Sequence, residues 1–182
     1  MRWTHLIADL SAQLDADDRA VRDADVAELT RAFAGGSTLV DRLRSAAGHE
    51  VTLHVCAGDP VTGRVEDVAR EWVLLSVAGH QVVVPLHAVD HVRGLGPGSA
   101  GPVDGVASRL SLGHVLRGLA RDRTVVHVRT RHTSLAGRVE RVGADHLDLV
   151  AAPAWGERGG PDGALRTVVP VGAVVLVADQ VR

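Results

Sequence analysis

The sequence has few aromatic residues, no lysine and a single cysteine. Aromatic residues make up 2% of the 182 positions, and tyrosine is absent. All twenty basic residues are arginines, and against twenty-two acids they leave a formal net charge of −2. A global positive field that would attract nucleic acid or an anionic membrane is therefore excluded, and any such binding has to be local. The lone Cys56 excludes an internal disulfide and a multi-cysteine zinc site, and we expect it to be a small buried hydrophobe.

The sequence also lacks a long apolar run and a charged-then-apolar leader with a small-residue cleavage site. Hydrophobic residues nevertheless reach 46% of the chain, which is enough for a well-formed core. We therefore expect a soluble cytoplasmic protein that does not enter the membrane.

The first 36 residues are predicted to form an amphipathic helical arm that ends at Gly35-Gly36. Apolar residues recur there at spacings of three and four, which places them on one helix face: Trp3, Leu6, Ile7, Leu10 and Leu14. Residues 1–34 carry seven acids against four arginines, so the arm is acidic. Two interpretations remain open: the apolar face packs on the chain's own fold, or it docks on a partner or on a second copy.

From residue 37 the pattern changes to a short helix followed by strand-like runs. Ser37 or Thr38 is suited to cap the helix. The runs are separated by turns and read VTLHVCA, VTGRVEDV, WVLLSV, QVVVPL and AVDHVRG. A glycine- and proline-rich linker follows at residues 95–105. Residues 106–182 show the same order of predicted elements, a second helix and then the runs RTVVHVRT, SLAGRVERV, HLDLV, RTVVPV and AVVLVAD.

The tetrapeptide GRVE occurs at positions 63–66 and again at 137–140, which indicates an internal duplication. A constant offset of 73 also places His54 on His127. Gly63 and Gly137 fall in the long second strand of each copy, where a residue without Cβ would let the strand bend sharply enough to close a small barrel. The predicted fold is α+β and mainly β: an N-terminal helix, then two units of one helix and five strands at 37–94 and 106–182, each closed as an SH3-like barrel.

The order of elements in the first copy resembles the Sm-like family, and within it the bacterial Hfq branch. The tract VTLHVCAGDPVTGRVEDVAREWVLLSVAGHQVVVPLHAVDHV covers that domain in order, and His87-Ala88-Val89 stands where the family has its signature histidine, alanine and aliphatic residue. The resemblance implies two Sm-like barrels and single-stranded RNA as the ligand, with His87 in the binding site. Two departures work against RNA binding: Glu71, and Asp145 in the second copy, occupy the position of the base-stacking aromatic residue.

The second half of the chain contains another candidate region for binding nucleic acid. Residues 121–182 carry nine arginines against seven acids, and Arg129, Arg131 and His132 crowd one hairpin tip that is suited to grip phosphates. Trp155, in a loop inserted in the second copy, is suited to stack on a base or to anchor a partner. For the tip, the alternative is a solvated turn; for Trp155, it is a side chain folded back on its own barrel.

No catalytic motif is found, and we expect neither enzymatic activity nor a cofactor or metal. Two functions then remain: a non-catalytic regulator that binds single-stranded RNA or another nucleic acid, or a protein interaction scaffold that uses barrel edges and the N-terminal helix. In the resembled family the fourth strand of one barrel pairs with the fifth strand of the next. Three chains with two such barrels each would then form a ring of six barrels, a homotrimer. The alternative is a monomer in which the two barrels pack on each other and the acidic N-terminal helix docks on a protein partner.

Overall fold

The computed structural model describes residues 35–100, 110–151 and 166–179 of the chain. The chain divides into two compact units, Met1–Thr38 and Leu39–Arg182, and the described strands all belong to the second. The apolar face predicted for the N-terminal arm lies outside the described residues, as does Trp155 in the inserted loop.

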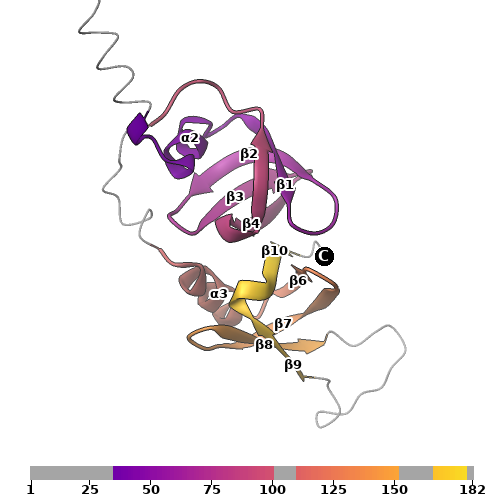
Figure 1. Ribbon diagram of the computed structural model, residues 1–182. Helices are drawn as coiled ribbons and strands as arrows, with labels where there is room; N and C mark the ends of the chain where they lie inside the picture. Colours follow the sequence, from indigo (N-terminus) through magenta and orange to yellow (C-terminus); the bar gives the residue numbers. More distant parts are fainter. Residues whose placement is uncertain (1–34, 101–109, 152–165, 180–182) are drawn as a thin grey trace, which may run out of the picture. The chain divides into compact units, whose positions relative to one another are not determined.

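In the described residues, each half of the second unit contains one α-helix and five strands (Figure 1). The first half contains α2 (Leu39–Ser45), β1 (Glu50–Val55), β2 (Val61–Val68), β3 (Trp72–Val77), β4 (His80–Pro85), the 3-10 turn η1 (Leu86–Ala88) and β5 (Val89–Arg93). The second half contains α3 (Leu112–Arg121), β6 (Val125–Thr130), β7 (Ser134–Val142), β8 (His146–Ala151), β9 (Arg166–Pro170), the turn η3 (Val171–Ala173) and β10 (Val174–Asp179). All ten strands match runs predicted from the alternating pattern.

Alternating side chains explain why these segments form strands with one buried face. In β2 the side chains of Val61 and Val65 are buried, whereas those of Thr62 and Arg64 are exposed. The period of two is that of a strand with one face on a core. The helices add one apolar stripe each: α2 packs on β2 through Leu43, and α3 packs on β7 through Leu116, and both leucines are fully buried.

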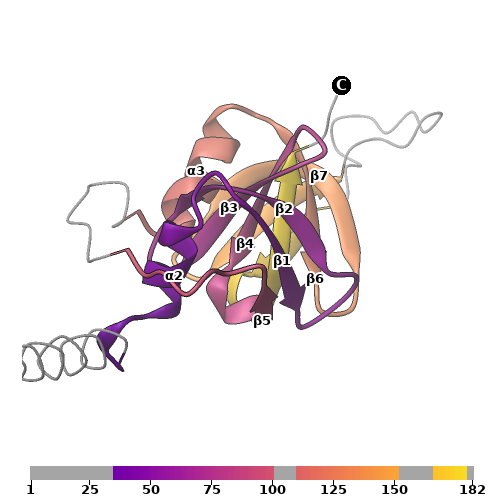
Figure 2. The same ribbon diagram turned by 90° about the horizontal axis from the view of Figure 1, so that it is seen from above.

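The expectation of two closed five-stranded barrels is wrong. The ten strands form one open antiparallel sheet in the order β5-β1-β2-β3-β4-β10-β6-β7-β8-β9. Within each half the order runs from the fifth strand to the fourth, and the two never pair with each other. The fourth strand of the first half, β4, instead hydrogen-bonds to β10 from the second half, and the two lie side by side in Figures 1 and 2. Because β4 takes its partner from the other half, the sheet continues rather than closing.

Two apolar clusters lie against this sheet, and the two halves exchange residues between them. The first cluster is built on α2 and β1 to β4, but it also contains Val175 from β10. The second is built on α3 and β6 to β10, and it contains Ala69, Trp72 and Val83 from the first half. Each half therefore completes the core of the other, so the unit is expected to unfold as one.

The internal duplication is visible in the backbone. A bulge interrupts the ladder between Val65 and Asp67 in β2, and another interrupts it between Val139 and Arg141 at the matching place in β7. The backbone N–H of Leu86 donates to the carbonyl of Glu71 at 2.8 Å, and that of Val171 donates to the carbonyl of Asp145 at 2.7 Å. A bulge re-aims a strand at a defined position, so its presence at both places supports a true repeat.

The constant offset of 73 fails in the first strand of the repeat. Leu53 pairs with Val92 and Thr52 with Arg93, whereas Val128 pairs with Val177 and His127 with Ala178. His127 therefore corresponds to Thr52, two residues away from the predicted His54. The shift of two residues keeps the same side chains buried because a strand repeats every two residues, so the hydrophobic pattern alone does not detect it.

Candidate interaction site

The junction of the two halves is a short antiparallel ladder with an apolar centre. Val83 of β4 pairs with Val177 of β10, and Val82 pairs with Ala178. Beyond these two pairs, a carboxylate oxygen of Asp179 accepts the backbone N–H of Gln81 at 2.9 Å. Val83 and Val177 are both buried. The fourth strand of the first half is thus a strand acceptor that is already filled by another segment of the same chain.

Helix α3 reinforces this junction through two hydrogen bonds from the first half. The backbone N–H of Leu112, the first residue of α3, donates to the carboxylate of Glu71 at 3.1 Å. The indole N–H of Trp72 donates to the carbonyl of Leu110 at 2.9 Å. Ser111, in the N-cap position, makes no side-chain cap hydrogen bond, so Glu71 supplies the capping acceptor from a distant strand. Glu71, which the predicted family resemblance would place at the position of a base-stacking aromatic, thus acts at this helix end.

Arg129 makes a third connection between the halves. Its guanidinium donates to the carbonyl of Asp59 at 3.3 Å, in the turn between β1 and β2. A Cβ on the neighbouring Gly58 would lie 2.7 Å from the Arg129 guanidinium, so the arginine packs directly over the turn. Arg129 was predicted to bind phosphate at the hairpin tip, but in the structure its guanidinium already holds a backbone carbonyl of the first half.

A small apolar cavity lies beside the junction. It has a volume of about 140 Å³ and is lined by side chains of α3, β3, β4, β6 and β10, among them Trp72, Leu74, Val115 and Leu119. A hollow of about 400 Å³ is lined by His80, His127 and Asp179 with their apolar neighbours. The His80 ring nitrogen Nδ1 is 3.8 Å from the Asp179 carboxylate, beyond hydrogen-bonding distance.

The described sheet ends in two outer strands, β5 and β9. β9 is the counterpart of β4 in the second half, but no described strand pairs with its outer side. Val83 and Val168 each stand two residues before the proline that ends their strand, Pro85 or Pro170. Val83 is 8% exposed because β10 covers it, whereas Val168 is 59% exposed. Edge strands present unpaired backbone groups, so β9 combines open hydrogen-bonding positions with an exposed apolar side chain.

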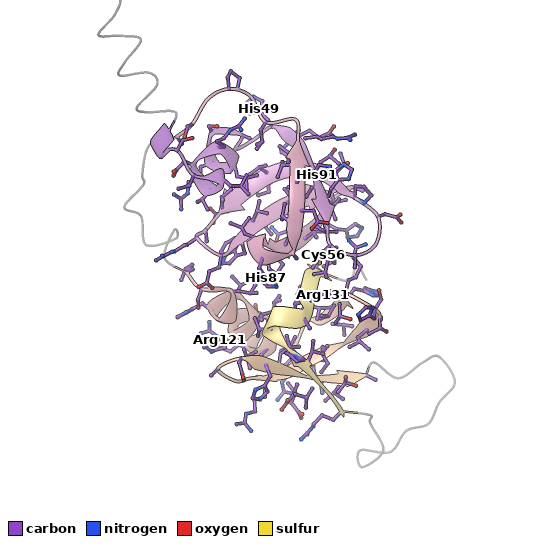
Figure 3. All side chains as sticks on the ribbon, in the orientation of Figure 1. His49, Cys56, His87, His91, Arg121 and Arg131 are labelled. Atoms are coloured by element: carbon purple, nitrogen blue, oxygen red, sulfur yellow. The ribbon has the colours of Figure 1, made fainter. Side chains whose placement is uncertain are left out.

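Three of the predicted nucleic-acid residues lie in exposed positions on two separate elements. His87 is on the η1 turn after β4, and Arg131 is in the turn between β6 and β7 (Figure 3). His132 follows Arg131 in the same turn. Arg129 is held against Asp59, as described above. No hydrogen bond between these residues is seen in the described part of the chain. Cys56, expected to be buried, is exposed because it lies just past the end of β1 and outside the alternating pattern.

Gly63 and Gly137 lie where neighbouring strands approach closely. A Cβ on Gly63 would be 2.7 Å from the carbonyl oxygen of Ser76 in β3, and a Cβ on Gly137 would collide with the carbonyl of Val150 in β8. Each glycine stands two residues before the bulge of its strand. Both positions therefore require glycine, because a side chain there would clash with the backbone of the neighbouring strand.

Two histidines stack on the outer edge formed by β1 and β5. His54 pairs with His91 across the ladder, and their ring centroids are 4.0 Å apart at an interplanar angle of 12°. Desolvation of the ring, followed by the charges of His91 and Arg93, lowers the pKa of His54 below its ordinary value. In the turn before β8, the hydrogen bond with His146 lowers the pKa of the Asp145 carboxyl.

Within the described ranges, no group of three or more histidine, cysteine or acidic side chains could hold a metal ion. In the same part of the chain, no helix is long and apolar enough to span a bilayer. No protein-family model matches the sequence, and a search against curated proteins found no match. The resemblance to the Sm-like family therefore stays a prediction.

Sequence reasoning missed Val168 and the junction residues Glu71 and Trp72. Val168 lies in a run that was predicted as a strand, but nothing in the run itself distinguishes an edge strand from a covered one. The available signal was the repeat: Val83-Val84-Pro85 and Val168-Val169-Pro170 align, so an exposed and a buried copy of one position could be compared.

Proposed function

We propose that this protein is a non-catalytic interaction module that binds a protein strand at the edge of β9. The observation that carries the proposal is the exposed Val168, whose counterpart Val83 is buried under a strand. The same site in the first half already accepts β10, so the repeat supplies a strand acceptor of known geometry. Main-chain hydrogen bonds would provide affinity, and the Val168 side chain would fix the register.

The alternative is binding of nucleic acid, and it has weaker support. His87 and the pair Arg131 and His132 are exposed on two separate elements, and Arg129 is engaged with Asp59. Exposed arginine also neighbours acid elsewhere on the sheet: Arg166 forms an ion pair with Glu140 at 2.7 Å. A mixed surface of this kind concentrates little positive charge for phosphates.

Two labelled probes distinguish these functions by fluorescence anisotropy on the full chain. The first is a peptide with the sequence of β10, Val174–Asp179, and the second is a short uridine-rich RNA. We expect the peptide to bind equally well at about 50 mM and about 200 mM salt, because strand addition releases no counterions, whereas phosphate contacts weaken steeply over that range.

The matched variants are Val168→Asp and Ala136→Asp. Both place a carboxylate on an exposed strand position, but Ala136 is on β7, which has a partner on each side. Val168→Asp should weaken peptide binding at least tenfold and Ala136→Asp should leave it unchanged. Salt-sensitive binding of RNA together with no binding of the peptide would overturn the proposal in favour of a nucleic-acid regulator.

A further inference from the structure

The apolar cavity beside the junction is assembled from both halves of the chain. β3 and β4 of the first half form one part of its wall, and α3, β6 and β10 of the second half form the other. Its buried lining is apolar and consists of Trp72, Val83, Val126 and Val177. The volume of about 140 Å³ is close to that of an apolar cavity of about 150 Å³, which stays dry and binds one benzene molecule. The interior is therefore suited to a single small apolar group.

One end of the cavity is polar and meets solvent. Gln81 at this end is exposed, and the side chain of Asp179 is 39% exposed. Among the described residues that line the cavity, Asp179 is the one that carries a charge. Its carboxylate oxygen Oδ1 accepts the backbone N–H of Gln81 at 2.9 Å, whereas Oδ2 makes no hydrogen bond to any residue that the structure describes. The open end of the cavity thus presents a carboxylate oxygen that can still accept a hydrogen bond.

An apolar cavity that opens beside one carboxylate selects a ligand with two parts. The apolar part gains free energy by leaving water for the buried lining. A cationic part donates a charge-assisted hydrogen bond to the Asp179 carboxylate, and such bonds are shorter and stronger than those between neutral groups. An anionic ligand of the same shape is repelled by Asp179. The two features together therefore favour a small cation with one compact apolar group.

We propose that this cavity binds a small primary amine whose apolar group is about the size of one benzene ring. The apolar group lies against Trp72 and Leu119, which belong to different halves, and the ammonium group donates to Oδ2 of Asp179. Because both halves form the wall, the bound amine stabilises their junction. β6, β7 and β8 lie between β10 and β9 in the sheet, so the amine site and the proposed strand-binding edge are separate and are tested independently.

Three probes of similar size test the proposal on the full chain: phenethylamine, phenethyl alcohol and hydrocinnamate. The titrations are run at about pH 8, where the amine is charged and histidine is ordinarily neutral, because the His80 ring is 3.8 Å from the Asp179 carboxylate. The readout is the indole N–H resonance of Trp72 in a two-dimensional NMR spectrum, identified by its loss in Trp72→Phe. We expect phenethylamine to shift this resonance to saturation with an affinity about tenfold higher than that of phenethyl alcohol, and hydrocinnamate to leave it unchanged.

Two variants separate the carboxylate from the cavity. Asp179→Asn keeps an oxygen that can accept the Gln81 N–H but removes the charge, so it should weaken phenethylamine about tenfold and leave phenethyl alcohol unchanged. Asp90→Asn removes an exposed carboxylate from β5, at one end of the sheet, and is the matched control that should bind as the wild type does. Val115→Phe fills the cavity from α3 and should abolish the binding of both probes. Circular dichroism checks that each variant is folded.

The wild type alone is enough to overturn the proposal, so the test does not depend on any variant that fails to fold. A Trp72 resonance that none of the three probes shifts would overturn it, as would equal affinities for phenethylamine and phenethyl alcohol. Phenethylamine binding that is unchanged in Asp179→Asn would show that the carboxylate is not the acceptor, and it also overturns the proposal. Binding that persists in folded Val115→Phe would place the amine outside the cavity, with the same consequence.

Discussion

The carboxylate of Glu71 accepts the backbone N–H of Leu112 at 3.1 Å, so a side chain of the first half caps the helix of the second half. Beside it the Trp72 indole donates to the carbonyl of Leu110. Together with the ladder between β4 and β10, these contacts make the two repeats interdependent. The repeats share a fold plan, but among the described strands only the fourth strand of the first half has a partner on its outer side, so β9 has no described strand on its outer side.

Replacing Glu71 by alanine should destabilise the protein by about 1 kcal/mol, the usual effect of losing a helix cap. The backbone N–H of Leu112 would lose its acceptor, and the favourable position of an acid at the start of α3 would be lost as well. Urea unfolding followed by circular dichroism measures the change. Glu66→Ala removes an exposed acid from β2 and is the control; equal effects of the two substitutions would contradict the capping role.

Replacing Trp72 by phenylalanine should cost about 2 kcal/mol of unfolding free energy, because the carbonyl of Leu110 loses its donor and the smaller ring leaves space in the core. Trp72 is 4% exposed and belongs to the second cluster although it lies in the first half. Trp72→Ala should cost more, about 3 to 5 kcal/mol. Urea midpoints within error of the wild type for Trp72→Phe would show that the indole N–H contributes nothing.

The strands could be predicted from the sequence because their alternation and their turns are local. β2, for example, begins and ends at the predicted residues, Val61 and Val68, since its apolar side chains alternate and the turn Gly58-Asp59-Pro60 precedes the run. The pairing of β4 with β10 could not be predicted in the same way. It joins residues that are far apart in the sequence through backbone groups, which every residue except proline carries.

The candidate site was also hidden because its residues act through distant partners. Trp72 was the start of a predicted strand, and nothing near it in the sequence indicates that its indole reaches Leu110. Arg129 was assigned to phosphate binding from local charge alone, whereas its guanidinium reaches Asp59 in the other half. The repeat offset failed at His54 because a two-residue shift leaves the buried pattern unchanged.

Gly58 and Arg129 should be energetically coupled. Gly58 has a φ of +82°, so Gly58→Ala should cost about 1 kcal/mol from backbone strain, and the added Cβ would also displace the Arg129 guanidinium. Gly79→Ala is the matched control, since Gly79 has a φ of +87° and open space around its Cβ position. In an Arg129→Ala background, the destabilisation that comes from displacing the guanidinium should disappear. A double-mutant cycle should therefore give a coupling energy of about 1 kcal/mol between the two positions. Additive effects would contradict the contact.

The stacked pair His54 and His91 should make the protein less stable as the pH falls. The pKa of His54 is lowered in the folded state by desolvation and by the charges of His91 and Arg93, so the unfolded chain takes up this proton first. The neutral His54 ring therefore makes its full contribution to the free energy of unfolding above the pKa of the unfolded chain, about 6.5. That contribution is lost as the pH falls through the lower pKa of the folded state.

Substituting His54 by glutamine should flatten this part of the pH profile, which urea unfolding at steps from about pH 5 to about pH 8 records. His49→Gln removes one exposed ring from the turn before β1 and is the control (Figure 3). In an NMR titration, His91→Gln should raise the pKa of His54 part of the way to its ordinary value, because desolvation and Arg93 remain. A profile with the same slope in His54→Gln and in the wild type would show that the stacked pair does not govern the acid sensitivity.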